Sequence, residues 1–287
     1  METETKPKSK TIAIQGGYGA FHEIAAIKYF GDENIEIVPR NTFKDLFQAL
    51  KKGIVDFGIT AIENSLAGSI LPNYSLLLES RMKIIGEIYL RIKQNLVALP
   101  GQKIQDIKEV YSHPMAILQC QSFFDDYPKI KLVDSVDTAL SAKMIADEQL
   151  TGIAAIASDL AAKKYKLEIV AEQIETNKMN YTRFLILQNI NGSTVSNENA
   201  NKASLSFALA HQIGSLSKIL SIFSFHDINL SKIQSMPIIG KDWEYQFYVD
   251  VEIADYQRYL HALSAINPFT SGVHILGEYT SGRKLLD

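Results

Sequence analysis

The segment Asn180-Tyr181-Thr182-Arg183-Phe184 opens an apolar run and carries two side chains that could take part in chemistry. Arg183 can hold a carboxylate through two parallel hydrogen bonds. Thr182 offers a hydroxyl that can donate a hydrogen bond without carrying a charge. For one isolated motif, an ordinary edge strand with a surface arginine is the favoured interpretation.

A second polar group, Glu63-Asn64-Ser65, directly follows the apolar run of residues 55–62. Three hydrogen-bonding side chains at the C-terminal end of a buried strand stand where α/β folds bind ligands. Turn chemistry, in which Asn and Ser cap the next element, explains the same residues and is favoured when the motif is taken alone.

The glycine-rich segment of residues 16–22 links a predicted strand to a predicted helix. Its glycines would let the backbone approach a ligand, and free N–H groups at a helix start favour an anion. The dinucleotide-binding fingerprint needs a third glycine where His22 stands, so a nucleotide site is disfavoured. An anion site and a plain tight turn remain equal alternatives.

His113 and Cys120 are the remaining candidates for proton transfer or nucleophilic attack. His113 stands directly before a predicted helix, where packing at the helix start is its more ordinary role. Cys120 lies within that helix, where we expect a buried small hydrophobe rather than a nucleophile. The six histidines show no HExxH spacing, so no metal site is predicted.

The composition is that of an ordinary globular chain, with 46% hydrophobic and 21% charged residues among 287. This excludes a mostly disordered or collagen-like protein. The net charge of −3 provides no basic excess for binding nucleic acid. The single cysteine excludes an intrachain disulfide and favours a reducing compartment. No apolar run approaches the ~20 residues that cross a bilayer, and residues 1–10 resemble a flexible solvated tail, so a cytoplasmic location without a membrane partner is predicted.

Apolar runs alternate with helical patterns through the first two thirds of the chain, which predicts a mostly parallel sheet covered by helices. Two strands then follow one another without a helix between them. We therefore expect two α/β lobes joined by crossing strands near residues 85–95 and 165–175, with a ligand cleft between the lobes. Predicted strands cover residues 11–15, 35–38, 55–62, 84–92, 95–99, 131–136, 152–157, 169–173 and 182–188, and predicted helices cover 21–30, 42–52, 115–124, 138–147 and 160–165.

The stretch of residues 189–202 is poor in apolar residues and contains five asparagines, which predicts a linker. Beyond it, the order strand-helix-strand-strand-helix-strand predicts a small ferredoxin-like domain at residues 203–287. The two-lobed domain is expected at residues 11–188, with lobe 1 at about 11–90 and 168–188 and lobe 2 at about 91–167.

Taken in order, these motifs resemble those of the prephenate dehydratase family, in the form that carries a C-terminal ACT regulatory domain. No single motif is specific, but the ordered set is. The matching signatures are Gly16–Phe21, Ile62–Ser65 with Gly68, Ser112–Pro114 with Gln119-Cys120, Asp137–Ala139, Ala154–Ser158 and Asn180–Phe184. The resemblance implies a two-lobed fold like that of type II periplasmic binding proteins, followed by a βαββαβ ACT domain.

The resemblance also implies an activity: loss of carbon dioxide and water from prephenate to give phenylpyruvate in L-phenylalanine biosynthesis, without a cofactor. Thr182 would contact the leaving hydroxyl and Arg183 would hold a carboxylate, with Glu63 and His113 in support. Further substrate-binding residues would be Gly19, Ala20, Asn64, Ser65, Asn180 and Phe184. Arogenate dehydration and a non-catalytic two-lobed binding protein or sensor remain alternatives.

The expected allosteric effector is L-phenylalanine, bound around two segments of the C-terminal domain. These segments contain Gly214, Ser215 and Leu216, and then Asn229, Leu230, Gln234, Ser235, Met236 and Pro237. Gln234 and Met236 replace a glutamate and an arginine of the family pattern, which changes the expected effector affinity. Near the substrate turn, Gly17, Ala20 and His22 also depart from the pattern. A homodimer or homotetramer paired through these domains is expected.

Overall fold

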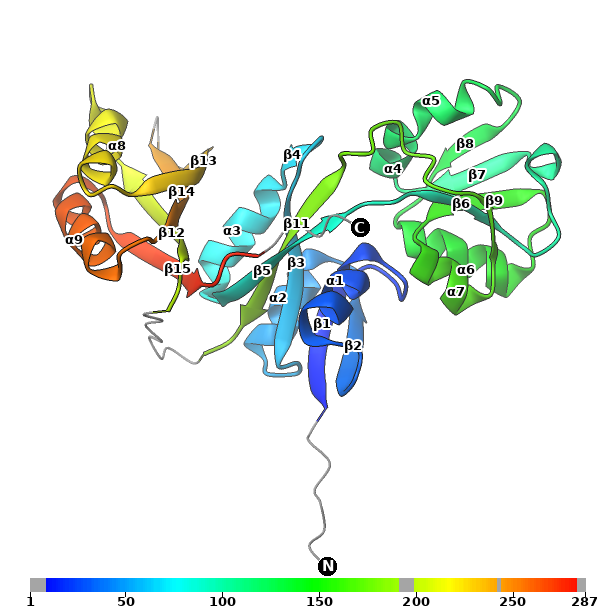
Figure 1. The fold of residues 1–287 in the computed structure, drawn as a ribbon, viewed down its shortest axis with the longest axis horizontal. Coiled ribbons are helices and arrows are strands. Elements are labelled where there is room, and N and C mark those ends of the chain that lie inside the picture. The colour runs from blue at the N-terminus through cyan, green and yellow to red at the C-terminus, as the bar shows by residue number, and fades with distance from the viewer. Residues whose placement is uncertain (1–8, 191–198, 242–243, 283–287) are drawn as a thin grey trace, which may run out of the picture. The chain divides into compact units, whose positions relative to one another are not determined.

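A computed structural model describes residues 9–190, 199–241 and 244–282 of the chain (Figure 1). Its strands form three sheets. The chain divides into two compact units, residues 9–68 with 89–184 and residues 69–88 with 185–282, and the division falls within strands β5 and β11. Most of the predicted tail and of the predicted linker lies outside the described residues, so both remain predictions.

The first sheet has the strand order β2-β1-β3-β11-β5, with the short β4 paired to β3. Strand β1 runs parallel to both β2 and β3, as the alternating pattern predicts. Its strands are β1 (Lys10–Gln15), β2 (Ile35–Arg40), β3 (Phe57–Asn64), β4 (Gly68–Ser69), β5 (Lys83–Arg91) and β11 (Tyr181–Gln188).

Helices α1 (Phe21–Phe30) and α2 (Phe43–Lys51) follow β1 and β2 in the chain. The sequence predicts that Thr42 begins this helix, with Asp45 as its capping partner. The start is confirmed, because Thr42 accepts a hydrogen bond from the Asp45 amide at 3.1 Å. The spacing of Phe43, Leu46, Phe47 and Leu50 predicts a buried face, and the structure buries Leu46, Phe47 and Leu50.

The second sheet has the order β10-β6-β9-β7-β8, and β6 is antiparallel to both of its neighbours. The prediction placed residues from about 168 in lobe 1, but β10 pairs with β6, so the chain returns to the first sheet only after Ala171. The strands are β6 (Asn95–Ala98), β7 (Glu109–Ser112), β8 (Lys131–Asp134), β9 (Ile153–Ala157) and β10 (Glu168–Ala171), and the helices are α4 (Pro114–Gln119), α5 (Gln121–Phe124), α6 (Thr138–Glu148) and α7 (Asp159–Tyr165), with a short 3₁₀ turn η1 (Ile104–Asp106).

Two helical segments differ from the sequence prediction. The single helix expected at residues 115–124 is broken at Cys120, whose φ of −107° and ψ of 8° end α4 and begin α5. Helix α3 (Leu71–Ser80) was not predicted. Pro72 in its first turn is compatible with a helix start, but Ile70 provides no side-chain cap, so the usual start signal is absent.

The third sheet has the order β13-β14-β12-β15 and follows the predicted strand-helix-strand-strand-helix-strand pattern. Its core contains Leu205, Phe207, Ile219, Phe223 and Tyr259. The elements are β12 (Lys202–Leu209), α8 (Ser215–Phe225), β13 (Asn229–Pro237), β14 (Tyr245–Glu252), α9 (Tyr256–Ile266), η2 (Asn267–Phe269) and β15 (Val273–Tyr279). Among the described helices, none combines the length and the apolar character that crossing a bilayer requires.

Candidate active site

Asn64, the last residue of β3, has a side-chain orientation that its neighbours determine. Its Oδ1 accepts hydrogen bonds from the backbone amides of Leu66 at 3.0 Å and Ala67 at 2.9 Å. A backbone amide can only donate, so the oxygen of Asn64 must face the loop and its Nδ2 must face the other way. This local turn therefore aims an amide donor at strand β11.

The Nδ2 of Asn64 meets three acceptors at the start of β11. They are Asn180 Oδ1 at 2.7 Å, Thr182 Oγ1 at 3.0 Å and the carbonyl of Tyr181 at 3.2 Å. Thr182 is 9% exposed and Asn180 is fully buried. Because Thr182 accepts in this contact, its own hydroxyl proton is not used there and can be donated to a ligand.

Gln119, which is not among the site residues predicted from the sequence, extends this network. Asn180 Nδ2 donates to Gln119 Oε1 at 2.9 Å, and the backbone carbonyl of Gln119 accepts from the Thr176 amide at 2.8 Å. The end of α4 thus fixes the side chain of Asn180, whose Oδ1 accepts the hydrogen bond from Asn64. The one sequence feature that could have indicated this role is the Gln119-Cys120 signature of the family.

Ser65 joins the loop after β3 to the chain that leads into β11. Its hydroxyl donates to the carbonyl of Met179 at 3.0 Å and accepts from the amide of Tyr181 at 2.9 Å. The Ser65 amide also donates to the Tyr181 carbonyl at 2.8 Å. Ser65 therefore has a clear structural role next to the Asn64–Thr182 pair.

Arg183 lies in a different environment from Thr182. Consecutive residues of a strand point to opposite faces of the sheet. The Arg183 guanidinium is 3% exposed, lies 3.4 Å from Glu63 Oε1, and stands over the ring of Tyr89 at 5.9 Å from its centroid. Glu63 and the face of the tyrosine ring therefore compensate this buried cation.

Phe184 packs in the core with His22. The two rings meet edge to face with centroids 4.9 Å apart, and Phe184 is 1% exposed. The Nε2 of His22 accepts a hydrogen bond from the Ala61 amide at 3.3 Å, which requires the neutral ring. Burial lowers the pKa of His22 to about 3. In this structure Phe184 supports β11 from the core side.

The glycine turn between β1 and α1 has two amides already bound by carboxylates of the protein. Gly19 N–H donates to Glu23 Oε2 at 2.5 Å, and Gly17 N–H lies 3.5 Å from Asp137 Oδ1. The sequence allowed an anion site built from free amides of this turn. At these two positions, carboxylates of the protein itself bind the amides instead. Ala20, which follows Gly19, is buried.

The same turn packs against α7 of the second lobe. Ser158 Oγ donates to the Gly19 carbonyl at 2.6 Å and caps α7 by accepting from the Ala161 amide at 3.0 Å. Gly19 has a φ of +87°, and a Cβ there would lie 2.5 Å from Ala161 Cα. Only glycine fits this position, both because of the positive φ and because of the close approach of the two backbones.

His113 and Asp137 both stand at helix starts in the second lobe. His113 is exposed, and its Nδ1 accepts from the Met115 amide at 3.2 Å, so the neutral ring carries its proton on Nε2. Asp137 caps α6 by accepting from the Leu140 amide at 2.8 Å. Burial raises the pKa of Asp137, and hydrogen bonds from backbone amides oppose that shift.

Cys120 is buried at the break between α4 and α5, as the sequence predicts. Burial raises the pKa of its thiol to about 12, and the nearby charge of Glu175 adds to the shift. Since the thiolate is the nucleophilic form of cysteine, this residue is unreactive at neutral pH.

The segments expected to bind an effector lie in the third sheet and its first helix. Gly214, with a φ of 79°, precedes α8, which begins at Ser215 and continues with Leu216. Asn229, Leu230, Gln234, Ser235, Met236 and Pro237 all belong to β13, an edge strand of that sheet. Gln234 Nε2 donates to the carbonyl of Ser235 at 2.8 Å.

In the part of the chain that the structure describes, no group of three or more His, Cys, Asp or Glu side chains is placed to hold a metal ion. The side chains around Thr182 are amides and hydroxyls. Their arrangement can orient a bound molecule and donate a hydrogen bond to a leaving oxygen.

The model of the prephenate dehydratase family matches residues 12–191. Arogenate dehydratase 2 of Petunia hybrida is 39% identical over 291 residues, which cover 94% of this chain and 71% of that protein.

Two solved structures resemble the whole chain. The prephenate dehydratase of Arthrobacter aurescens in complex with L-Phe has a TM-score of 0.83 and 27% identity, and the match covers 94% of this chain and 90% of that one. A structure described as GqqA, a novel type of quorum quenching acylase, has a TM-score of 0.85 and 28% identity, with 95% and 98% covered. Since the family model spans more than half of the sequence, the chain belongs to the prephenate dehydratase family.

Proposed function

We propose that Thr182 assists departure of the ring hydroxyl in the reaction of this family, the decarboxylating dehydration of prephenate to phenylpyruvate. That reaction makes the chain a carbon–oxygen lyase of phenylalanine biosynthesis. The main support for this role of Thr182 is its contact with Asn64, whose side-chain amide donates to Thr182 Oγ1 at 3.0 Å. The bond leaves the hydroxyl proton of Thr182 available for the substrate.

The chemistry requires little from the protein besides orientation and one hydrogen bond. The bond between the ring and its carboxylate breaks, and its electron pair enters the ring, which becomes aromatic. The carbon–oxygen bond breaks at the same time, and the departing hydroxide takes a proton to become water. Thr182 is too weak an acid to give up its proton outright, so its role is to polarise and position the leaving oxygen.

Neutral donors suit the carboxylate that is lost. Strong cationic binding of that group would stabilise the ground state more than the transition state, because its charge disappears as carbon dioxide forms. The amides and hydroxyls around Thr182 meet this requirement. The network of Asn64, Asn180 and Gln119 would hold them in one arrangement.

The family resemblance implies that Arg183 holds a carboxylate of the substrate. The buried guanidinium already has Glu63 and the Tyr89 ring, and it points to the face of β11 opposite to Thr182. We therefore propose that Arg183 and Glu63 join β11 to β3 and position Thr182, rather than contact substrate directly. His113 stays a candidate for a supporting role.

Arogenate, which carries an amino group where prephenate carries a keto group, is the second candidate substrate. The reason is the name of the Petunia relative, an arogenate dehydratase. The reacting ring and its hydroxyl are the same in both molecules, so the proposed role of Thr182 holds for either.

An acyl-transfer reaction is not supported by this site. A hydroxyl nucleophile needs an adjacent base that can take its proton. The contact of Thr182 is with an amide donor, which cannot accept a proton, and Cys120 is buried with its pKa raised to about 12.

We also propose that the C-terminal βαββαβ region is an ACT domain that controls the enzyme through L-phenylalanine. The complex of the Arthrobacter enzyme with L-Phe supports this effector. Gln234 and Met236 stand where the family pattern has charged side chains, so weak binding is expected. The double variant Gln234→Glu/Met236→Arg should respond to lower phenylalanine concentrations than the natural chain.

A homodimer or homotetramer is the proposed assembly. Ile213 and Ile239 are 102% and 99% exposed, in the connections that follow β12 and β13. Leu209 and Pro237 both pair with Tyr245, so the two connections leave the same end of the third sheet. Fully exposed isoleucines are expected where a second copy covers them. The cytoplasmic location stays a prediction from the sequence.

A side-by-side assay tests the proposed activity. Prephenate, arogenate and an acyl amide are each incubated with the full chain, with and without L-phenylalanine, and the products are separated by chromatography. We expect phenylpyruvate from prephenate, and slower turnover with phenylalanine present. Release of a carboxylic acid from the acyl amide, without turnover of prephenate or arogenate, would contradict the proposal.

A further inference from the structure

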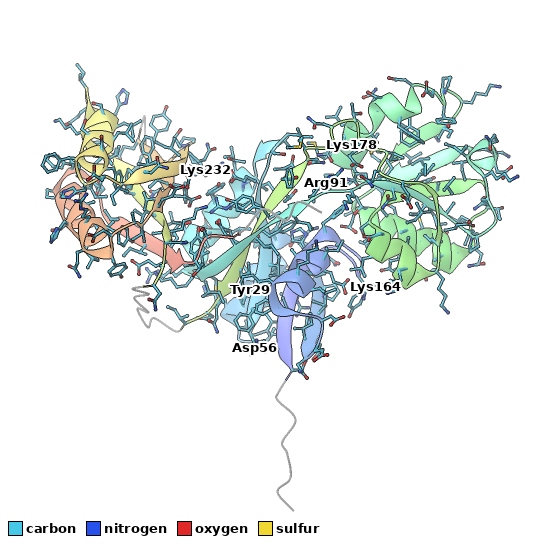
Figure 2. All side chains as sticks on the ribbon, viewed as in Figure 1. Tyr29, Asp56, Arg91, Lys164, Lys178 and Lys232 are labelled. Atoms are coloured by element: carbon cyan, nitrogen blue, oxygen red, sulfur yellow. The ribbon has the colours of Figure 1, made fainter. Side chains whose placement is uncertain are left out.

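Lys232, on β13 of the third sheet, makes a contact outside that sheet. Its Nζ donates to Ser69 Oγ, in strand β4, at 2.8 Å; Lys232 is labelled in Figure 2. The pairing of β13 with β14 shifts register between Leu230 and Lys232. Such an irregularity re-aims the side chains that follow it, and Lys232 is the first residue after the shift.

The segment of residues 64–69, here called the loop, runs from the last residue of β3 to the last residue of β4. Other hydrogen bonds also hold this loop. Asn64 Oδ1 holds the amides of Leu66 and Ala67, and Ser65 is bound to Met179 and Tyr181. The contact with Lys232 fixes the far end of the loop. Lys232 lies outside residues 12–191, the part of the chain that the family model matches.

Ser69 also begins a segment, residues 69–88, that belongs to the same compact unit as the third sheet. The ring of Tyr74 lies 5.0 Å from that of Tyr248. Lys202 Nζ binds both carboxylate oxygens of Glu87, at 2.9 and 3.0 Å, and both side chains are buried. Charge-assisted hydrogen bonds are the strong ones, so this pair links residues 69–88 firmly to β12 of the third sheet.

The close packing of β15 on β5 shows the same attachment. A Cβ at Gly277 would lie 2.2 Å from the carbonyl oxygen of Ile84, so only glycine fits there. The amide of Gly282 donates to Glu87 Oε1 at 3.1 Å. Strand β5 then continues to Tyr89, whose ring lies under Arg183.

We propose that Lys232 is a positioning residue for the dehydration: by holding Ser69, it sets the loop of residues 64–69 and so the amide of Asn64 on the hydroxyl of Thr182. The proposal rests on the proposed role of Thr182. Strand β13, which contains the second predicted effector segment, would then also help to orient the active-site side chains. A ligand that moves β13 then acts on Thr182 through Ser69 and Asn64.

The test compares steady-state rates on prephenate for single variants of the full chain and for the double variant Lys232→Met/Ser69→Ala. Lys232→Met removes the donor, Lys232→Arg restores one, Ser69→Ala removes the acceptor, and Lys131→Met is the matched control. Lys131 lies 3.1 Å from Glu109 in an exposed ion pair of the second sheet. The melting temperature of each variant is measured alongside.

We expect Lys232→Met and Ser69→Ala each to lower kcat about tenfold with little change in KM, because the loop loses one end of its support. The double variant should be no slower than either single one, since both remove the same contact. Lys232→Arg should recover at least half of the rate. These changes should occur without a matching drop in melting temperature.

A kcat of Lys232→Met equal to that of Lys131→Met would overturn the proposal. A loss of melting temperature that accounts for the loss of rate, with no recovery in Lys232→Arg, would also overturn it. Thr182→Val is measured in the same series to separate the two ideas. If Thr182→Val is inactive and Lys232→Met is normal, only the positioning role fails; if Thr182→Val is fully active, the proposed site fails and the positioning role with it.

Discussion

Asn64 and Thr182 are 118 residues apart in sequence, and the amide of the first donates to the hydroxyl of the second at 3.0 Å. The orientation of this amide is not free, because two backbone amides of the following loop bind its oxygen. A local turn at the end of β3 therefore determines how a hydroxyl on β11 is used.

The first prediction concerns Asn64→Asp. This variant keeps the oxygen that binds Leu66 and Ala67, but replaces the donor to Thr182 by a carboxylate oxygen. That oxygen would repel the Asn180 and Tyr181 acceptors. It would also accept the hydroxyl proton of Thr182, which would then no longer be available to the substrate. We expect kcat on prephenate to fall about 10²-fold, with KM changed much less. A rate within threefold of the natural chain would show that the Asn64 donor is unimportant.

The second prediction concerns Gly19→Ala, with Gly31→Ala as its control. Both glycines have positive φ, at +87° and +79°, but a Cβ at Gly31 meets nothing within 4 Å, whereas at Gly19 it would lie 2.5 Å from Ala161 Cα. Gly31→Ala should therefore cost only the backbone strain of its φ of 79° and ψ of 167°, about 1–3 kcal/mol. Gly19→Ala should cost about 1–3 kcal/mol more than Gly31→Ala, because the close contact with α7 adds to the strain of positive φ; both losses are measured by urea unfolding. Equal losses in the two variants would mean that the turn is not tightly packed on α7.

The third prediction is a pH dependence from His22. Its pKa is about 3 in the folded chain against 6.5 for the ordinary group, because burial disfavours the charged ring. The unfolded chain therefore binds more protons between these values, and stability is lost as the pH falls below 6.5. At pH 5 the loss from this group is about 2 kcal/mol relative to neutral pH.

His22→Gln keeps an acceptor for the Ala61 amide but does not titrate. The gap in unfolding free energy between pH 7.5 and pH 5 should shrink in this variant. His261→Gln, at an exposed position of α9, should keep the gap of the natural chain. An unchanged gap in His22→Gln would contradict the pKa assignment.

The fourth prediction uses the single cysteine as a probe. Cys120 is 0% exposed and burial raises its pKa to about 12. A thiol reagent should leave the folded chain unlabelled at pH 8 and label one group per chain after denaturation. Cys120→Ala should retain kcat within twofold and lose about 1–2 kcal/mol of stability. Rapid labelling that abolishes activity would assign the thiol a role in the site.

The elements that the sequence predicts well are those with local signals. The helix at α2 has a capping threonine and a regular apolar face, and both are confirmed. Helix α3 lacks a capping side chain and was missed. The break at Cys120 has a tertiary cause: Gln119 directs its carbonyl to the Thr176 amide, more than 50 residues away, which no local pattern contains.

In the candidate site, the sequence indicates the types of residue, but not which residues on other strands they contact. The types in the Asn64 and Thr182 motifs suggest hydrogen-bond chemistry, but only the pairing of β3 with β11 brings the two motifs together. For Arg183 the family resemblance implies a substrate carboxylate as partner. The neighbouring strand supplies Glu63 instead, and the guanidinium is buried. Partners on other strands decide what such a side chain can do.

The hydroxyl of Thr182 is the centre of this account, and one pair of variants tests it directly. Thr182→Ser keeps the hydroxyl and Thr182→Val replaces it by a methyl group of similar size. Steady-state assays on prephenate should give a kcat for Thr182→Ser within about tenfold of the natural chain, and a loss of at least about 10²-fold for Thr182→Val. A Thr182→Val enzyme that turns over prephenate within twofold of the natural rate, with an unchanged melting temperature, would contradict the account.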